Sequence, residues 1–132
     1  MFSLLLAAIA LAHTGTVWTG CQHSPEVRPQ TIVIACGDGN FGAIGLRWTS
    51  WAPSSAVATG TGQQNDCKPY CAAGHVRAYP MSIRLSDPVT CVAGRREFAR
   101  ISWHWTTPIP KLAGVPRTGS ETLPCRFLKL EP

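Results

Sequence analysis

Apolar and polar residues alternate along short stretches of the chain, which is the pattern of β-strands that bury one face. The clearest stretch is 98–105 (FARISWHW), where Ile101, Trp103 and Trp105 share a face. Residues 81–85 (MSIRL) alternate in the same way. No segment repeats apolar residues at helical spacing over several turns, so the sequence predicts strands rather than helices.

Further strands are predicted next to strong turn signals. Residues 31–36 (TIVIAC) form a β-branched run typical of a buried strand, and the turn residues 37–40 (GDGN) end it. Residues 45–51 and 56–60 are also predicted as strands. The polar residues 60–66 (GTGQQND) are predicted as a loop.

The second half of the chain continues this pattern. Residues 75–79 alternate before Pro80, which predicts an edge strand or a bulge because proline has no backbone N–H. Residues 107–124 are rich in proline and glycine and are predicted as a loop, and residues 126–130 (RFLKL) as a last strand that closes the sheet.

Short strands separated by turns at intervals of roughly 8–12 residues are typical of all-β domains. We therefore expect a single β-rich domain over residues 29–132. Its expected architecture is a small disulfide-stapled antiparallel sandwich, immunoglobulin-like in outline, with an open barrel as the alternative. The predicted core consists of Ile32, Ile34, Leu46, Trp48, Ile83, Leu85, Ile101 and Trp103.

The pair Trp103 and Trp105 has two interpretations. Buried tryptophans on a central strand are common in sandwiches, and the polar residues that alternate with this pair favour that interpretation. On the surface, the same pair would form a platform on which sugar rings stack.

The chain begins with an almost entirely apolar run over residues 2–12, which is too short to span a bilayer. The run ends in the small-x-small pattern (ALA) that a signal peptidase requires. We therefore predict a signal peptide over residues 1–12, which could extend to about residue 20, and a secreted, extracellular protein. In the alternative, Cys21 is part of a lipobox and carries a lipid anchor, which would leave an odd number of cysteines for pairing.

Charge is sparse and moderately positive. Charged residues make up 14% of the chain, and 12 basic against 7 acidic side chains give a net charge of +5. Arg95, Arg96 and Arg100 form the one basic cluster, a candidate patch for an anionic envelope polymer or glycan, although such clusters also serve as solvated hairpin ends. The cluster lacks interleaved aromatic residues, so no nucleic-acid partner is expected.

Six cysteines in an exported chain are expected to form three disulfides, each stabilising the fold by roughly 2–4 kcal/mol. They are Cys21, Cys36, Cys67, Cys71, Cys91 and Cys125. Many pairings are open, and spacing alone does not choose among them. Cys67, Cys71 and His75 also have the spacing of zinc ligands, but an oxidising compartment removes the thiolates, so neither a metal nor a cofactor is expected.

Several segments of the chain together resemble a family of small secreted actinobacterial proteins of unassigned function. They are IVIACGDGN, LRWTSW, ATGTG, NDCKPYCAAG and YPMSIRLSDPVTC. The resemblance covers about residues 29–105, and its most specific pieces are CGDGN and NDCxPxCAxG. It implies an N-terminal signal and a compact β-rich body, and it supplies no catalytic residues.

The resemblance also implies a disulfide pattern. Four cysteines lie inside the matching region, while Cys21 and Cys125 lie outside it, which suggests that these two pair with each other. Cys36 would then be joined to the loop of Cys67 and Cys71, and that loop to Cys91.

A weak calcium candidate lies in the glycine turn 37–40. Asp38 and Asn40 offer two side-chain oxygens, and Asn65 and Asp66 would add two more if the loops meet. A full calcium loop has more acidic ligands at alternate positions, so ordinary turn residues are the favoured interpretation.

No catalytic constellation is recognisable. The sequence has no G-x-S-x-G, no H-E-x-x-H and no paired carboxylates placed for sugar hydrolysis, and His75 and His104 have no identifiable nucleophile beside them. We expect a monomeric, non-enzymatic binding or accessory protein of the cell envelope or extracellular space. The alternatives are a small secreted hydrolase and a protease inhibitor that presents Lys68, although Pro69 directly after it makes a poor substrate mimic.

Overall fold

The computed structural model describes residues 15–21, 24–91, 94–123 and 125, and these form one antiparallel sheet of six strands in sequence order. The strands are β1 (Ile32–Val33), β2 (Phe41–Trp51), β3 (Ala56–Asn65), β4 (Val76–Thr90), β5 (Arg96–Trp105) and β6 (Thr118–Thr122). Two 3-10 turns interrupt the loops, η2 (Cys71–Ala73) and η4 (Pro110–Leu112). Among the described residues, no helix is long and apolar enough to cross a membrane.

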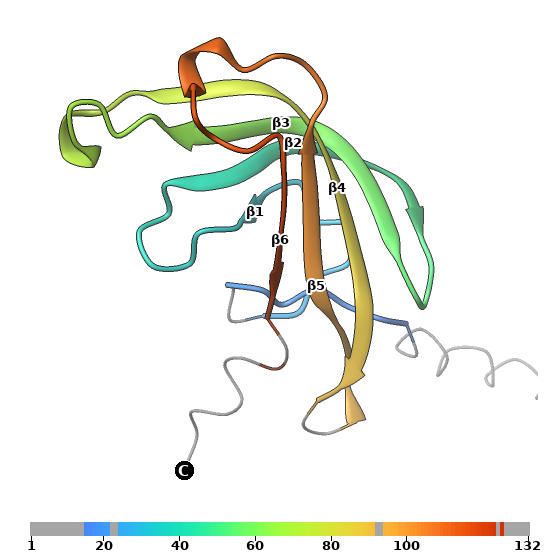
Figure 1. The fold of residues 1–132 in the computed structure, drawn as a ribbon. Helices are drawn as coiled ribbons and strands as arrows, with labels where there is room; N and C mark the ends of the chain where they lie inside the picture. Colours follow the sequence, from blue (N-terminus) through green and yellow to red (C-terminus); the bar gives the residue numbers. More distant parts are fainter. Residues whose placement is uncertain (1–14, 22–23, 92–93, 124, 126–132) are drawn as a thin grey trace, which may run out of the picture.

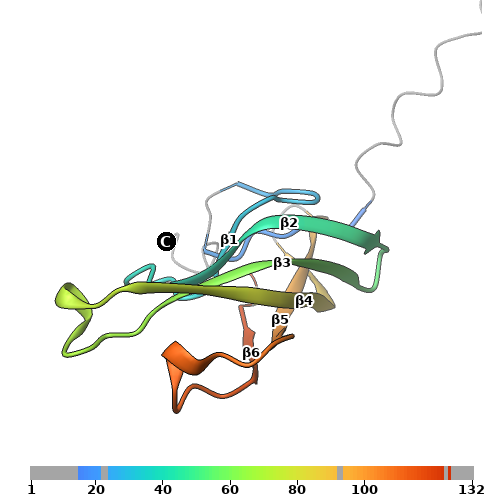
Figure 2. The same cartoon turned by 90° about the horizontal axis from the view of Figure 1, so that it is seen from above.

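The sheet curls into a half-barrel (Figures 1 and 2). The predicted all-β, antiparallel, disulfide-bonded class is confirmed, and the single curved sheet corresponds to the open-barrel alternative rather than to two sheets packed face to face. Strand β2 contains two irregularities, since its register with β3 shifts between Ile44 and Arg47 and again between Trp48 and Ser50. Such bulges increase the local twist and bend of a strand.

The concave face of the sheet holds the apolar core. Of the eight core residues predicted, six are buried, namely Ile32, Ile34, Leu46, Ile83, Leu85 and Ile101. The remaining two, Trp48 and Trp103, are half-buried and pack against this core. Ala56 and Ala58 of β3 are also fully buried, and their small size lets the larger side chains of the neighbouring strands meet across the concave face.

Two strand predictions need correction. Residues 60–66 were expected to be a loop, but β3 continues to Asn65 because this polar stretch pairs in register with β4. The predicted loop 107–124 contains the sixth strand, β6, and the last strand predicted at 126–130 lies outside the described residues. Pro80 lies at a local edge, since β4 pairs with β5 only from Met81 onward.

Residues 15–21 belong to the folded body, which therefore begins before the predicted boundary at residue 29. Trp18 is 2% exposed, and the backbone of Val17 exchanges hydrogen bonds with β5. The Thr16 hydroxyl donates to the Pro53 carbonyl at 2.6 Å, and the Thr16 carbonyl accepts a hydrogen bond from Trp51 Nε1 at 2.9 Å. The signal peptide predicted over 1–12 lies outside the described residues, but an extension to residue 20 would remove part of this core.

All six cysteines form disulfides, as predicted, but the pairing implied by the resemblance is wrong. The bonds join Cys21 to Cys36, Cys67 to Cys71, and Cys91 to Cys125. Cys21 lies beside the end of β1, where the Cys21 sulfur also contacts the Val33 carbonyl, whereas Cys125 meets Cys91 at the end of β4. Because the Cys21 sulfur is bonded to Cys36, it cannot also carry a lipid, and the lipid-anchored alternative does not fit this structure.

Candidate binding tip and neighbouring surfaces

The turn between β3 and β4 projects from one end of the half-barrel (Figures 1 and 2). We call residues 66–75 the tip. Its base continues the strand pairing, since the Asp66 N–H donates to the His75 carbonyl at 2.9 Å. Within the tip, the single turn η2 contains no buried residue. The apolar core therefore does not extend into the tip.

Two polar side chains at the base hold the tip in place of a core. The Asn65 amide donates to the Cys71 carbonyl at 2.8 Å, and its oxygen accepts from the Cys67 N–H at 2.8 Å. The Asp66 carboxylate accepts from the N–H groups of Lys68 and His75 at 3.1 and 3.0 Å. Each side chain thus binds both arms of the turn and fixes their separation.

The Asp66 carboxylate is in an environment that favours its charged form. Its side chain is 4% exposed and forms an ion pair with Arg77 at 3.0 Å. The backbone N–H of His75, helped by that of Lys68 and by Arg77, lowers the pKa of Asp66 to about 2. The carboxylate is therefore ionised throughout the physiological range and keeps its acceptor oxygens.

Covalent and steric features add to this rigidity. The disulfide between Cys67 and Cys71 closes the outer part of the tip. Gly74 lies so close to Asn65 that a Cβ at that position would be 2.1 Å from the amide oxygen, so a larger residue would displace the side chain that holds the tip.

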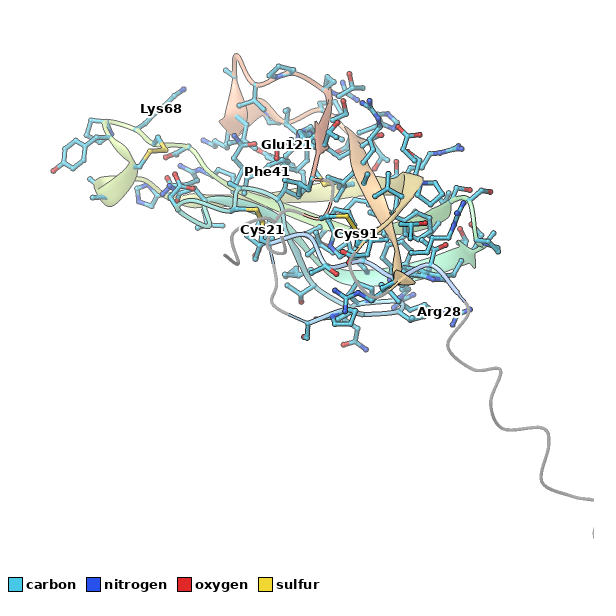
Figure 3. All side chains as sticks on the ribbon, turned by 90° about the horizontal axis from the view of Figure 1, so that it is seen from below. Cys21, Arg28, Phe41, Lys68, Cys91 and Glu121 are labelled. Carbon is cyan, nitrogen blue, oxygen red and sulfur yellow. A yellow bond between two sulfur atoms is a disulfide. The ribbon has the colours of Figure 1, made fainter. Side chains whose placement is uncertain are left out.

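The outer end of the tip presents its side chains to solvent. Tyr70 is 63% exposed, and Lys68, Pro69 and His75 are also exposed. Figure 3 shows Lys68 at the extremity of the molecule, directed away from the body. The tip thus combines a fixed backbone with a free aromatic ring and a free cation.

The structure does not support the zinc or the calcium site considered from the sequence. The sulfur atoms of Cys67 and Cys71 are bonded to each other, and no group of three or more His, Cys, Asp or Glu residues that could hold a metal occurs in the described part of the chain. Asn40 and Asn65 do meet, at 3.3 Å, but the amide of Asn65 is used by the tip. The Asp38 carboxylate accepts a hydrogen bond from the Asn40 N–H, the role of an ordinary turn residue.

The predicted arginine cluster is largely neutralised. Arg95 pairs at 3.0 Å with Glu97, whose side chain is only 5% exposed, and Arg100 pairs at 2.8 Å with the exposed Asp87. Arg96 is exposed at the start of β5. The structure instead brings Arg100 close to Arg84, because Arg84 pairs with Ser102, two residues further along β5.

Arg84 and Arg100 lie on the outer face of the sheet among hydroxyl groups. Ser82, Ser102 and His104 surround an open hollow of about 250 Å³ beside Arg84. The Ser82 hydroxyl lies 3.5 Å from His104 Nδ1, a pairing that the sequence did not reveal. The described contacts of His104 include no carboxylate that would orient it for general-base catalysis.

The two tryptophans of β5 differ in their surroundings. Trp105 is fully buried, whereas Trp103 is half-buried and lines a cleft beside β6. The core interpretation is therefore correct for Trp105 and correct in part for Trp103, which packs against the core and also lines the cleft.

Tyr70 was missed as a candidate site residue, and Asn65 and Asp66 were considered only as calcium ligands rather than as the residues that hold a turn. Their signal is present in the sequence, because Asn-Asp directly before two closely spaced cysteines, with Gly74 after them, is typical of a side-chain-stabilised turn. No family model, no curated protein and no solved structure matches this chain. The resemblance to a secreted actinobacterial family therefore stays a prediction.

Proposed function

We propose that this chain is a non-enzymatic binding protein that acts outside the cytoplasm and contacts a protein partner through the tip. The three disulfides support an oxidising compartment, because such bonds are rare in the reducing cytosol. One observation carries the proposal. The tip is held by a disulfide, an ion pair and several side-chain hydrogen bonds, although its turn η2 contains no buried residue.

Rigidity of this kind improves binding rather than folding. A loop that is already fixed in its bound conformation loses little conformational entropy when a partner binds. Tyrosine is enriched among the residues that dominate binding energy, because it contributes a large ring with few rotatable bonds. A protruding tip fits a concave partner surface, and Lys68 favours one that carries acidic groups.

Photo-crosslinking tests this proposal directly. A photoreactive phenylalanine analogue replaces Tyr70, and a matched probe replaces Thr49, which is exposed on β2 and away from the tip. On envelope and secreted fractions, we expect a discrete crosslinked protein from position 70 alone. Excess unlabelled protein should abolish the product, and Tyr70→Ala should compete about thirtyfold less well, since a hot-spot residue contributes about 2 kcal/mol or more. Equal products from both positions would refute the role of the tip.

Protease inhibition is a special case of the same proposal. Lys68 at the end of a closed, rigid loop is the side chain that a trypsin-like enzyme binds in its acidic pocket. Titration of trypsin with the purified protein tests it, and stoichiometric inhibition that Lys68→Ala removes would identify the partner class. Absence of inhibition would exclude trypsin as the partner and argue against presentation of Lys68 to a trypsin-like pocket.

A second candidate function is the binding of an anionic envelope polymer by the outer face. Arg84 and Arg100 lie close together on this face and favour an anionic ligand. Among the described residues, Asp87 is the one carboxylate that pairs with either of them, and it pairs with Arg100. A pull-down on cell-wall material at about 0.1 M and 1 M salt should show binding only at low salt, because screening is much stronger at 1 M. Replacement of Arg84 and Arg100 by Ser should remove it, whereas Arg96→Ser should leave it unchanged.

A further inference from the structure

A cleft of about 340 Å³ lies between the two ends of the half-barrel, where the curl of the sheet brings β2 and β3 opposite β5 and β6. Phe41, Gln64, Trp103 and Glu121 line it, one from each of these four strands. Figure 3 labels Phe41 and Glu121, which lie close together on this side of the molecule. Pockets for small organic ligands begin at roughly 300 Å³, so this cleft is of the size for a small ligand.

Two aromatic rings form the apolar wall of the cleft. The ring centroids of Phe41 and Trp103 are 5.1 Å apart and the rings meet edge to face. Gly119 of β6 pairs with Trp103, and a Cβ there would be 2.4 Å from the indole ring. The backbone of β6 therefore lies directly against the indole and fixes its orientation. A tryptophan held in this way presents a fixed apolar surface to whatever enters the cleft.

Polar groups surround the aromatic wall. The Gln64 amide can both donate and accept hydrogen bonds. The ion pairs of the described residues involve Asp66, Asp87 and Glu97, so Glu121 has no cationic partner among them. An unpaired carboxylate beside an aromatic wall is a strong acceptor for hydroxyl groups.

From this combination we infer that the cleft binds a single neutral sugar ring, such as one residue of a glycan chain. The apolar C–H face of a pyranose packs on an aromatic wall, while its hydroxyl groups bond to carboxylate and amide oxygens at the edge. The carboxylate disfavours an anionic sugar. A quaternary ammonium ion such as choline is the competing occupant of a cleft with aromatic and carboxylate groups, and the titration below distinguishes it from a sugar. This site is separate from the tip and does not depend on the function proposed above.

The test is an NMR titration of the full mature protein with soluble sugars. The probes are cellotriose, maltotriose and the β-1,4-linked trimer of N-acetylglucosamine, and these three arms distinguish the glycan of origin. A fourth arm uses choline. We expect at least one of them to shift the indole N–H signal of Trp103 saturably at millimolar concentration. The indole signal of Trp48, whose Nε1–H is bonded to the Pro29 carbonyl, should stay in place.

Two variants on β6 separate binding from folding. Glu121→Ala should weaken the sugar about tenfold or more, as expected for loss of a hydrogen bond to a charged group. Thr122→Ala is the matched control, because Thr122 lies next in the same strand and pairs with Arg100, on the outer face. It should bind as the wild type does. A saturable response to choline instead of sugars, no response to any sugar, or equal affinities for the two variants would each overturn the inference.

Discussion

The body and the tip are held together by different interactions. In the body, apolar side chains meet across the concave face of the sheet. In the tip, an asparagine, an aspartate and two half-cystines bond the two arms of the turn. Apolar burial is cooperative and non-directional, so it stabilises the body as a unit. The bonds of the tip are local and directional, and they fix one short turn in one conformation. The body thus supplies stability, while the tip supplies a defined shape, and the two should respond differently to the same kind of perturbation.

The largest expected difference is between Trp18→Ala and Tyr70→Ala. Trp18 is 2% exposed in the core, so its removal should cost about 3–5 kcal/mol of unfolding free energy, measured by urea denaturation. Tyr70 is 63% exposed, and its truncation should change stability by about 0.5 kcal/mol or less.

A chain that starts at Cys21 should be destabilised at least as much as Trp18→Ala, because it lacks the whole segment that bonds to Pro53, Trp51 and β5. Equal stability of this shortened chain and the full body would show that residues 15–20 are not part of the fold. The same result would restore cleavage near residue 20 as an option.

This segment also shows where prediction from sequence ends. The alternating strands, the turn at 37–40 and most core residues could be predicted, because each depends on a few neighbouring residues. The place of Trp18 could not be predicted, because its partner Glu26 and the nearby β5 are brought to it only by the fold. The disulfide pairing has the same limitation, since the distance between two cysteines depends on the curvature of the sheet.

The candidate surfaces follow the same division. The local turn chemistry of the tip is present in the sequence around Asn65, Asp66 and Gly74. The cleft is not, because Phe41 and Glu121 are far apart in the chain and meet only when the sheet curls. The ion pairing within the arginine cluster could also not be foreseen, because Arg100 pairs with Asp87, which belongs to another strand.

An intermediate effect is expected from the disulfides. Replacing Cys91 and Cys125 by Ser should lower the unfolding free energy by about 3–4 kcal/mol, because the bond closes a long loop of the body. Replacing Cys67 and Cys71 should cost about 1 kcal/mol or less, since their loop is short and its opening also frees the folded tip. Amide hydrogen exchange should then accelerate in residues 66–75 and stay slow in β5. Faster exchange throughout the sheet would contradict the independence of the two regions.

The smallest and most local effect is expected from acid. The pKa of Asp66 is lowered to about 2, mainly by the hydrogen bond from the His75 N–H, whereas an unfolded aspartate titrates near 3.9. A lowered pKa means that the ordered tip binds the proton less readily than the disordered tip. The stabilisation that Asp66 provides is therefore complete above about pH 4 and is lost as the pH falls through about 2.

NMR can follow this transition at the amide protons of Lys68 and His75, which donate to the Asp66 carboxylate. Their signals should be constant from neutral pH down to about 4 and then shift together with a midpoint near 2, while the amide of Ile101 in the core of β5 stays in place. In Asp66→Asn the transition should disappear, because the amide does not titrate and cannot pair with Arg77 as an anion. A midpoint near 3.9 in the wild-type protein would mean that the N–H groups do not hold the carboxylate, and the polar framework of the tip would then be no more than an ordinary surface turn.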